Sequence, residues 1–238
     1  GSPGVNDADI DAPEAWCIRT DASAAIIAVV DSGCLMNHAD LVGNIWVNPA
    51  DPVNGIDDDG NGLVDDVNGW DFLGNDNNPE DNDGHGTNVT GVCSMTGNNG
   101  IGGAGVCWQS TVMVLKDGDT IPQVALSAAA FQYAAAHGVA VLNFSSGYSQ
   151  AAQATMLTAV QACQAAGVVI TNSAGNGGGS IEGGNLDVPA EFTEDNLFVI
   201  AASQNGDGRA SFSDYGAISV DIAAPGEDIR TTTRTGGY

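Results

Sequence analysis

The chain has 238 residues, of which 30 are acidic and only 5 are basic, so its formal net charge is −25. A surface this acidic repels nucleic-acid phosphates and anionic membranes, which excludes both as expected partners. No apolar run is long enough to cross a bilayer, and the length suits a single α/β domain.

Short apolar runs rich in β-branched residues predict strands that are buried on both faces of a parallel sheet. They lie at 24–30, 112–115, 139–144, 168–171, 197–201 and 218–223. Alanine-rich stretches at 124–137 and 151–166 predict helices, the second of which ends at Gly167 in the usual manner. This alternation predicts an α/β fold with three layers, in which helices cover both faces of a mostly parallel sheet.

The N-terminal residues and the cysteines say little about function. Residues 1–11 lack the profile of a signal peptide and are interpreted as an N-terminal extension or processing remnant. Five cysteines leave at least one thiol without a partner in the chain. Cys93 and Cys107 flank a glycine-rich loop, and the sequence is equally compatible with a disulfide between them and with two buried free thiols.

Polar residues follow three of the predicted strands. Asp31 ends the first strand, 143–147 ends a middle one, and 174–176 follows the next. In a parallel sheet, ligands bind beyond the carboxyl ends of the strands. The sequence therefore predicts a site at this edge.

The residue types at that edge indicate nucleophilic catalysis. A serine hydroxyl needs a histidine to accept its proton, and the histidine needs a carboxylate to hold its tautomer. Asp31 and His85 supply these two groups, with His85 placed between two glycines at the start of a helix predicted from Thr87 onward. Asn176, in a glycine-flanked turn, can donate a hydrogen bond to a developing oxyanion. Each residue alone also has a plain structural interpretation, as a cap or a turn.

Several short blocks, taken in order, resemble the subtilisin-like serine proteases, the subtilase family or peptidase family S8. The blocks are Val29-Val30-Asp31-Ser32-Gly33, Asn37-His38-Ala39-Asp40-Leu41, Gly84-His85-Gly86-Thr87, Val141-Leu142-Asn143-Phe144-Ser145, Ala174-Gly175-Asn176, Arg209-Ala210-Ser211-Phe212-Ser213 and Ala223-Ala224-Pro225-Gly226. The resemblance starts near Ala12, so residues 12–238 are interpreted as one incomplete peptidase domain. The order Asp, His, Ser is that of subtilisin.

By this resemblance Asp31 and His85 are members of the catalytic triad and Asn176 is the side chain of the oxyanion hole. The pocket for the substrate residue before the scissile bond is expected to be flanked by Ser145, Ser146, Gly147, Ala174 and Gly175. No serine in the chain has the context of the nucleophile, so we expect it, and the C-terminal part of the fold, to lie beyond Tyr238. The resemblance also implies protein or peptide substrates, an inhibitory propeptide and a secreted or extracellular location.

The acidic segment at 57–65 predicts a calcium site. Oxygen-bearing side chains alternate there as in the first half of a calcium-binding loop, which nominates Asp57, Asp59, Asn61 and Asp65. A solvated acidic loop is the alternative. The resemblance to subtilases adds two further Ca²⁺ sites, one at Asp40 with Asn99 and one at Asp71, Asp76 and Glu80.

Three functions follow from these observations. The leading hypothesis is a calcium-stabilised serine endopeptidase whose nucleophile lies outside this chain, so that the fragment alone is inactive and poorly stable. The second is a catalytically inactive homologue that acts as a binding or inhibitory module. The third is a calcium-binding adhesive domain, which leaves Asp31 and His85 unexplained.

Overall fold

A computed structural model describes residues 9–182 and 187–238 of the chain, so residues 1–8 of the predicted N-terminal extension lie outside the described residues. Within them, seven parallel strands form one sheet in the order β2-β3-β1-β4-β5-β6-β7. The strands are β1 (Asp21–Asp31), β2 (Gly69–Asp71), β3 (Gln109–Lys116), β4 (Val141–Phe144), β5 (Val169–Ser173), β6 (Leu197–Ser203) and β7 (Ile222–Pro225).

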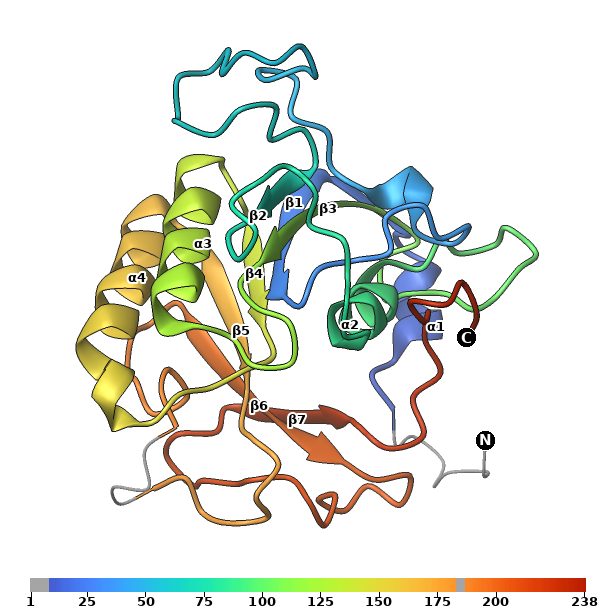
Figure 1. Ribbon diagram of the computed structural model, residues 1–238. Coiled ribbons are helices and arrows are strands. Elements are labelled where there is room, and N and C mark those ends of the chain that lie inside the picture. The colour runs from blue at the N-terminus through green and yellow to red at the C-terminus, as the bar shows by residue number, and fades with distance from the viewer. Residues whose placement is uncertain (1–8, 183–186) are drawn as a thin grey trace.

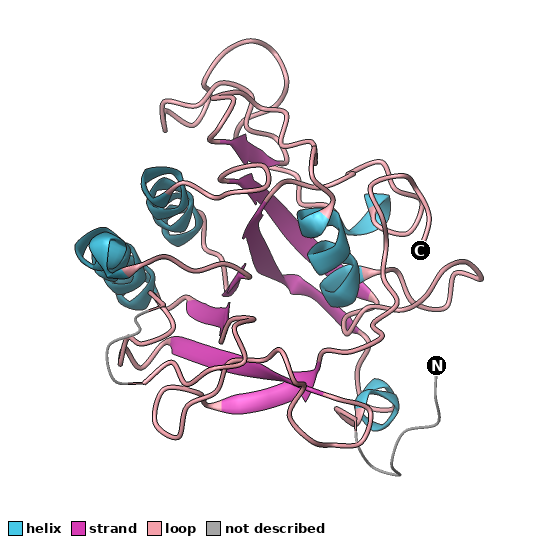
Figure 2. Cartoon of the chain, turned by 60° about the horizontal axis from the view of Figure 1, so that its bottom comes forward, coloured by secondary structure: helices cyan, strands magenta, loops and turns pink. Residues whose placement is uncertain are grey.

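Helices lie on both faces of this sheet, which confirms the predicted three-layer α/β fold (Figures 1 and 2). Helices α3 (Val124–Ala136) and α4 (Gln153–Ala166) pack together on one face, and α2 (His85–Ser94) packs on β1 and β3 from the other. The remaining helical segments are α1 (Ala12–Trp16) and two 3-10 turns, η1 (Val42–Asn44) and η2 (Gln150–Ala152). No described helix is long and apolar enough to span a membrane.

Two strands differ from the sequence prediction. The last strand begins at Ile222 rather than Ile218, because the Asp221 side chain accepts a hydrogen bond from Val199 N (2.8 Å) and the parallel ladder starts only after it. Strand β2 was not predicted, since its three residues are too few to show a periodic pattern. Helix α2 also begins two residues earlier than Thr87.

The core is built mainly from β1, β3 and β4 with α3 and α4, as the apolar runs predict. In contrast, one face of β5–β7 remains uncovered by the described residues. Apolar side chains there are unusually exposed: 37% for Val169, 42% for Phe198 and 55% for Ile222. An apolar hollow of about 340 Å³ lies between this face and α2.

The five cysteines are all free thiols. Cys107 N donates a backbone hydrogen bond to Cys93 O (3.0 Å), so the two residues flank the loop side by side without a disulfide.

Candidate active site

The carboxyl end of β1 and the first residue of α2 meet at the centre of the candidate site. Asp31 is the last residue of β1 and is almost fully buried, whereas the side chain of His85 is about half exposed. His85 Nδ1 lies 2.7 Å from Asp31 Oδ1 and 2.9 Å from Asp31 Oδ2. The buried carboxylate thus holds the proton on Nδ1 and leaves Nε2 free to accept one.

A second layer of hydrogen bonds fixes this pair. Ser32 N donates to Asp31 Oδ1 (2.8 Å), and Ser32 Oγ donates to Asp81 Oδ1 (2.9 Å) while it accepts from Gly86 N (2.9 Å). Asp81 is buried and its other oxygen accepts from Thr87 N (2.9 Å), which anchors the first turn of α2. The strand end and the helix start are therefore tied together through Ser32 and Asp81.

Close backbone approach explains the glycine that follows His85. A Cβ atom on Gly86 would lie 2.1 Å from Gly33 O. Only glycine allows β1 and α2 to come this near, and this proximity brings Asp31 within reach of His85.

The electrostatics suit a general base. The hydrogen bond and charge of Asp31 raise the pKa of His85 above its usual value, against the opposing effect of burial.

A second buried carboxyl, Asp117, follows β3 and lines the same hollow as His85. Burial raises the pKa of Asp117 to about 7, and Ser127 Oγ donates a hydrogen bond to it. Asp117 was missed in the sequence analysis, although it follows the predicted strand 112–115 at the same edge of the sheet as Asp31.

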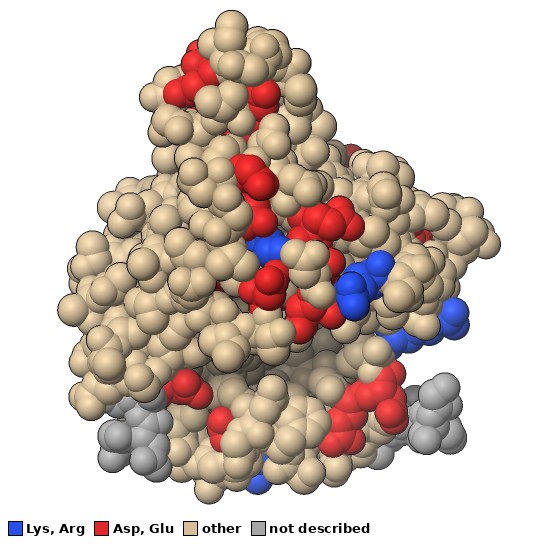
Figure 3. Space-filling model, viewed as in Figure 1, with Lys and Arg blue, Asp and Glu red and all other residues tan. Residues whose placement is uncertain are grey.

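Two adjoining hollows open at this edge of the sheet. The first, about 170 Å³, is lined by Asp31, His85, Ser145 and Ser146 among others. The second, about 130 Å³, shares both serines and is also lined by Gly147, Gly175 and Asn176. In Figure 3 the surface is hollowed between its upper and lower parts, and Asp and Glu gather around this region with few Lys or Arg.

The structure thus brings together all but one of the residues predicted at the active site. Asn176 is exposed at the second hollow, as an oxyanion donor requires. The exception is Ala174, which is buried in the core and does not line the hollow. Asp187 lines the second hollow but was missed, since it lies far from the other blocks in sequence.

No serine nucleophile is in place among the described residues. There, no hydroxyl group forms a hydrogen bond with His85 Nε2. Ser213, the most buried serine near the chain end, instead donates to Asp214 O and accepts from Ala202 N.

The structure brings Asp40 and Asn99 of the predicted metal site together. The Asp40 side chain is fully buried and accepts from Asn99 Nδ2 and, at 3.4 Å, from Gly103 N. A Cβ atom on Gly102 would lie 2.1 Å from the Tyr238 ring and 2.3 Å from Asp40 Oδ2, so glycine lets this ring pack beside the carboxylate. The carboxylate is a ligand that Ca²⁺ prefers, but the two groups that contact it here are N–H donors, which a cation would have to replace.

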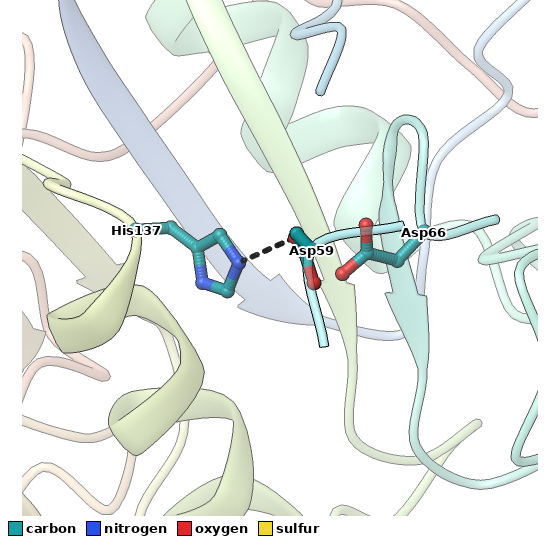
Figure 4. A group of neighbouring side chains, drawn as sticks. All are labelled: Asp59, Asp66 and His137. Carbon is teal, nitrogen blue, oxygen red and sulfur yellow. Dashed lines mark ion pairs between the residues drawn. The ribbon is translucent and has the colours of Figure 1, made fainter. Parts of the chain in front are cut away.

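The predicted loop site is only partly assembled. Asp57 and Asp65 point their carboxylates at backbone N–H groups of their own loop, at 2.7–3.1 Å. Asp59 instead converges with Asp66 and His137, whose ligand atoms lie within 4.8 Å of one another (Figure 4). Asn61 Nδ2 donates to Asp66 Oδ2 (2.7 Å) inside this group. Because calcium prefers oxygen ligands, the carboxylates of Asp59 and Asp66 fit it better than the imidazole does, whereas Asn61 presents its amide nitrogen to the group.

A lysine occupies the neighbourhood of the third predicted metal site. Buried Lys116 places its Nζ 3.8 Å from Asp71 Oδ2, 2.8 Å from Asp119 Oδ1 and 3.0 Å from Glu80 O. Asp71 and Asp76 do converge, since both Oδ2 atoms would lie within 3.2 Å of a Cβ atom on Gly74. The Glu80 side chain forms no described contact there. The ammonium group of Lys116 therefore already balances part of the negative charge of Asp71 and its neighbours. A metal ion fits this site poorly, because it would have to lie beside that ammonium group.

Comparison with known proteins supports the resemblance that the sequence motifs indicate. The subtilase family model matches residues 22–238. The chain is 32% identical over 231 residues to thermitase of Thermoactinomyces vulgaris, covering 96% of this chain and 72% of thermitase. It is also 32% identical over 226 residues to the thermophilic serine proteinase of Bacillus sp. strain AK1, covering 94% of this chain and 49% of that protein.

Solved structures of subtilisin-like proteases have the same fold as this chain. A cold adapted subtilisin-like serine proteinase superposes with a TM-score of 0.69 at 25% identity, covering 92% of this chain and 69% of that one. The S41 psychrophilic protease superposes with a TM-score of 0.71 at 28% identity, covering 91% and 70%. With its fold, its Asp31–His85 pair and these matches, the chain belongs to the subtilase family of subtilisin-like serine proteases.

Proposed function

We propose that the complete protein is a serine endopeptidase in which Asp31 and His85 work with a serine from outside these 238 residues. The observation that carries the proposal is the bidentate approach of Asp31 to His85 Nδ1, at the rim of a hollow that continues to Asn176. Structural ion pairs also bring Asp and His together, but they do not need an exposed imidazole face beside a peptide-sized hollow.

In the proposed reaction Asp31, His85 and Asn176 have separate roles. His85 Nε2 removes the proton of the serine hydroxyl as the oxygen attacks the peptide carbonyl, while Asp31 stabilises the imidazolium that forms. The Asn176 amide donates to the oxyanion of the tetrahedral intermediate. His85 then gives its proton to the leaving amine, and water releases the acyl group by the same route in reverse.

The uncovered face of β5–β7 supports an external source for the nucleophile. The hollow there is lined by Val89 and Cys93 of α2 and by residues of β5, β6 and β7. An apolar segment packed in it would bury the exposed Phe198 and Ile222 side chains. The same segment, entering between α2 and β7, would pass the imidazole of His85. We therefore propose that this chain alone is inactive.

Calcium, secretion and a propeptide complete the proposal. Buried Asp40 and the loop carboxylates would bind Ca²⁺ and brace segments on either side of the site. The match to the subtilase family supports a secreted enzyme. An inhibitory propeptide would occupy the same hollows as a peptide substrate.

Labelling with a fluorophosphonate tests the assignment. The complete protein should form a covalent adduct, whereas this chain and a His85→Ala variant of the complete protein should not. An Asn205→Ala variant, with an exposed amide outside the hollows, serves as the matched control and should label normally. A complete protein that fails to label but binds peptides would instead be an inactive homologue acting as a binding module.

A further inference from the structure

A carboxylate belongs to the lining of the second hollow. Asp187 lines this hollow together with Ser145–Gly147 and with Gly175 and Asn176. Two glycines beside Asp187 put no side chain of their own against its carboxylate oxygens. A Cβ atom on Gly147 would lie 2.9 Å from Asp187 Oδ1, and one on Gly175 would lie 3.2 Å from Asp187 Oδ2. The carboxylate therefore sits between the two segments predicted to hold a substrate side chain.

Nothing in the described residues balances the charge of Asp187. Its side chain accepts no hydrogen bond and forms no ion pair in residues 9–182 and 187–238. The neighbouring charge that acts on it, Asp214, is itself a carboxylate. Asp214 differs in being satisfied, since it accepts from Gly177 N (2.9 Å) and Gly179 N (2.7 Å).

The surroundings make this an unfavourable place for a lone negative charge. Partial burial, and next the charge of Asp214, raise the pKa of Asp187 above its usual value. A buried, unpaired carboxylate costs free energy unless a cation reaches it. The hollow also contains Asn172, only 2% exposed, whose Oδ1 has no hydrogen-bond partner. The interior thus offers acceptors that lack donors.

We propose that Asp187 makes this hollow select lysine or arginine in the substrate residue that precedes the scissile bond. The inference rests on the proposed endopeptidase function, since the hollow adjoins His85 through Ser145 and Ser146. The cationic head of such a side chain would pair with Asp187, and its methylene stem would pass between the glycines. The neutral hydroxyls of Ser145 and Ser146 admit the chain without repelling it.

Kinetic discrimination tests the proposal in the complete protein. Peptide anilides that differ only in the residue before the anilide, Lys, Arg, Leu or Gln, are compared by kcat/KM. We expect Lys and Arg to exceed Leu and Gln by at least about 10-fold, and Asp187→Ser to lower kcat/KM for Lys and Arg by about 30-fold or more. The same variant should leave Leu within about 3-fold of its original value. Asp187→Asn, which keeps the shape, should behave like Asp187→Ser.

A charge outside the hollow provides the control. Asp195→Asn removes one exposed negative charge without altering the lining of the hollow, and should keep the preference for Lys and Arg. Cleavage without that preference, or an equal effect of Asp187→Ser on all four substrates, would overturn the inference.

A binding measurement separates this inference from the catalytic proposal. Calorimetry with the His85→Ala variant compares peptides that end in Lys with the same peptides ending in Leu. Tighter binding of the Lys peptide that is lost in the double variant with Asp187→Ser supports the inference even if the complete protein neither labels nor cleaves. Equal binding of the two peptides contradicts the inference whether or not the protein is an enzyme.

Discussion

His85 Nδ1 contacts both carboxylate oxygens of Asp31, at 2.7 and 2.9 Å, although 54 residues separate them in the chain. The contact depends on the junction of β1 and α2, where Gly33 and Gly86 let the two backbones touch. It joins a buried charge to an exposed base, which is the arrangement that proton transfer at a surface cleft requires.

Replacement of Asp31 should therefore affect both rate and pH dependence. Asp31→Asn removes the largest cause of the raised pKa of His85, so the imidazole loses its proton at lower pH. Because the base must be neutral to act, the acidic limb of the pH profile of kcat/KM should move to lower pH. The rate should fall by about 10⁴-fold. A profile that keeps its acidic limb in place would argue against His85 as the base.

Loss of the Asn176 amide should slow the chemical step. Asn176→Ala is expected to lower kcat by about 10²–10³-fold with little change in KM, since the oxyanion exists only after attack. Steady-state kinetics of the complete protein measure this, with Asn205→Ala as the matched control. An effect confined to KM would show that Asn176 only binds substrate.

The glycine at the β1–α2 junction should be intolerant of a methyl group. Gly86→Ala forces a shift because its Cβ would overlap Gly33 O, and we expect a loss of about 1–3 kcal/mol in the free energy of unfolding. Gly43→Ala is the control, since a Cβ there meets nothing within 4 Å. Denaturant unfolding compares the two, and equal stabilities would contradict the close approach.

Asp117 should make stability fall as pH rises. Its pKa in the folded state is about 7, against an ordinary value of 3.8 for an aspartate in water, so the folded state holds the proton between these values. Stability then declines with pH from about 4 to 7, and the full penalty applies above 7. Asp117→Asn should therefore stabilise the protein at pH 8, by an amount on the order of 2–4 kcal/mol, and change little at pH 4. Unfolding curves at both pH values test this, with exposed Asp195→Asn as the control.

Chelation should destabilise the protein through Asp40. EGTA should lower the Tm of the complete protein, whereas it should lower the Tm of an Asp40→Asn variant much less, because a ligand that binds only the folded state stabilises it. Asp195→Asn should respond to EGTA like the unaltered protein. A Tm that is indifferent to EGTA in all three proteins would contradict the proposed calcium sites.

The sequence by itself determined the architecture and most of the catalytic edge. Buried parallel strands require continuous apolar runs such as Ala24–Val30, and local patterns of this kind survive whatever packs around them. Asp31, His85 and Asn176 were visible because each follows or opens a recognisable element. Register details, such as the start of β7 after Asp221, depend on one side chain and carry no pattern.

Only the tertiary structure decided which charges meet. Lys116 enters the set formed by Asp71 and Asp76, His137 joins Asp59 and Asp66, and Asp187 comes to lie between Gly147 and Gly175. These contacts join residues that are distant in the chain, and their energies depend on burial and on the nearest opposite charge. A linear sequence shows that a carboxylate is present, but the fold determines whether a backbone amide, a lysine or an incoming substrate balances it.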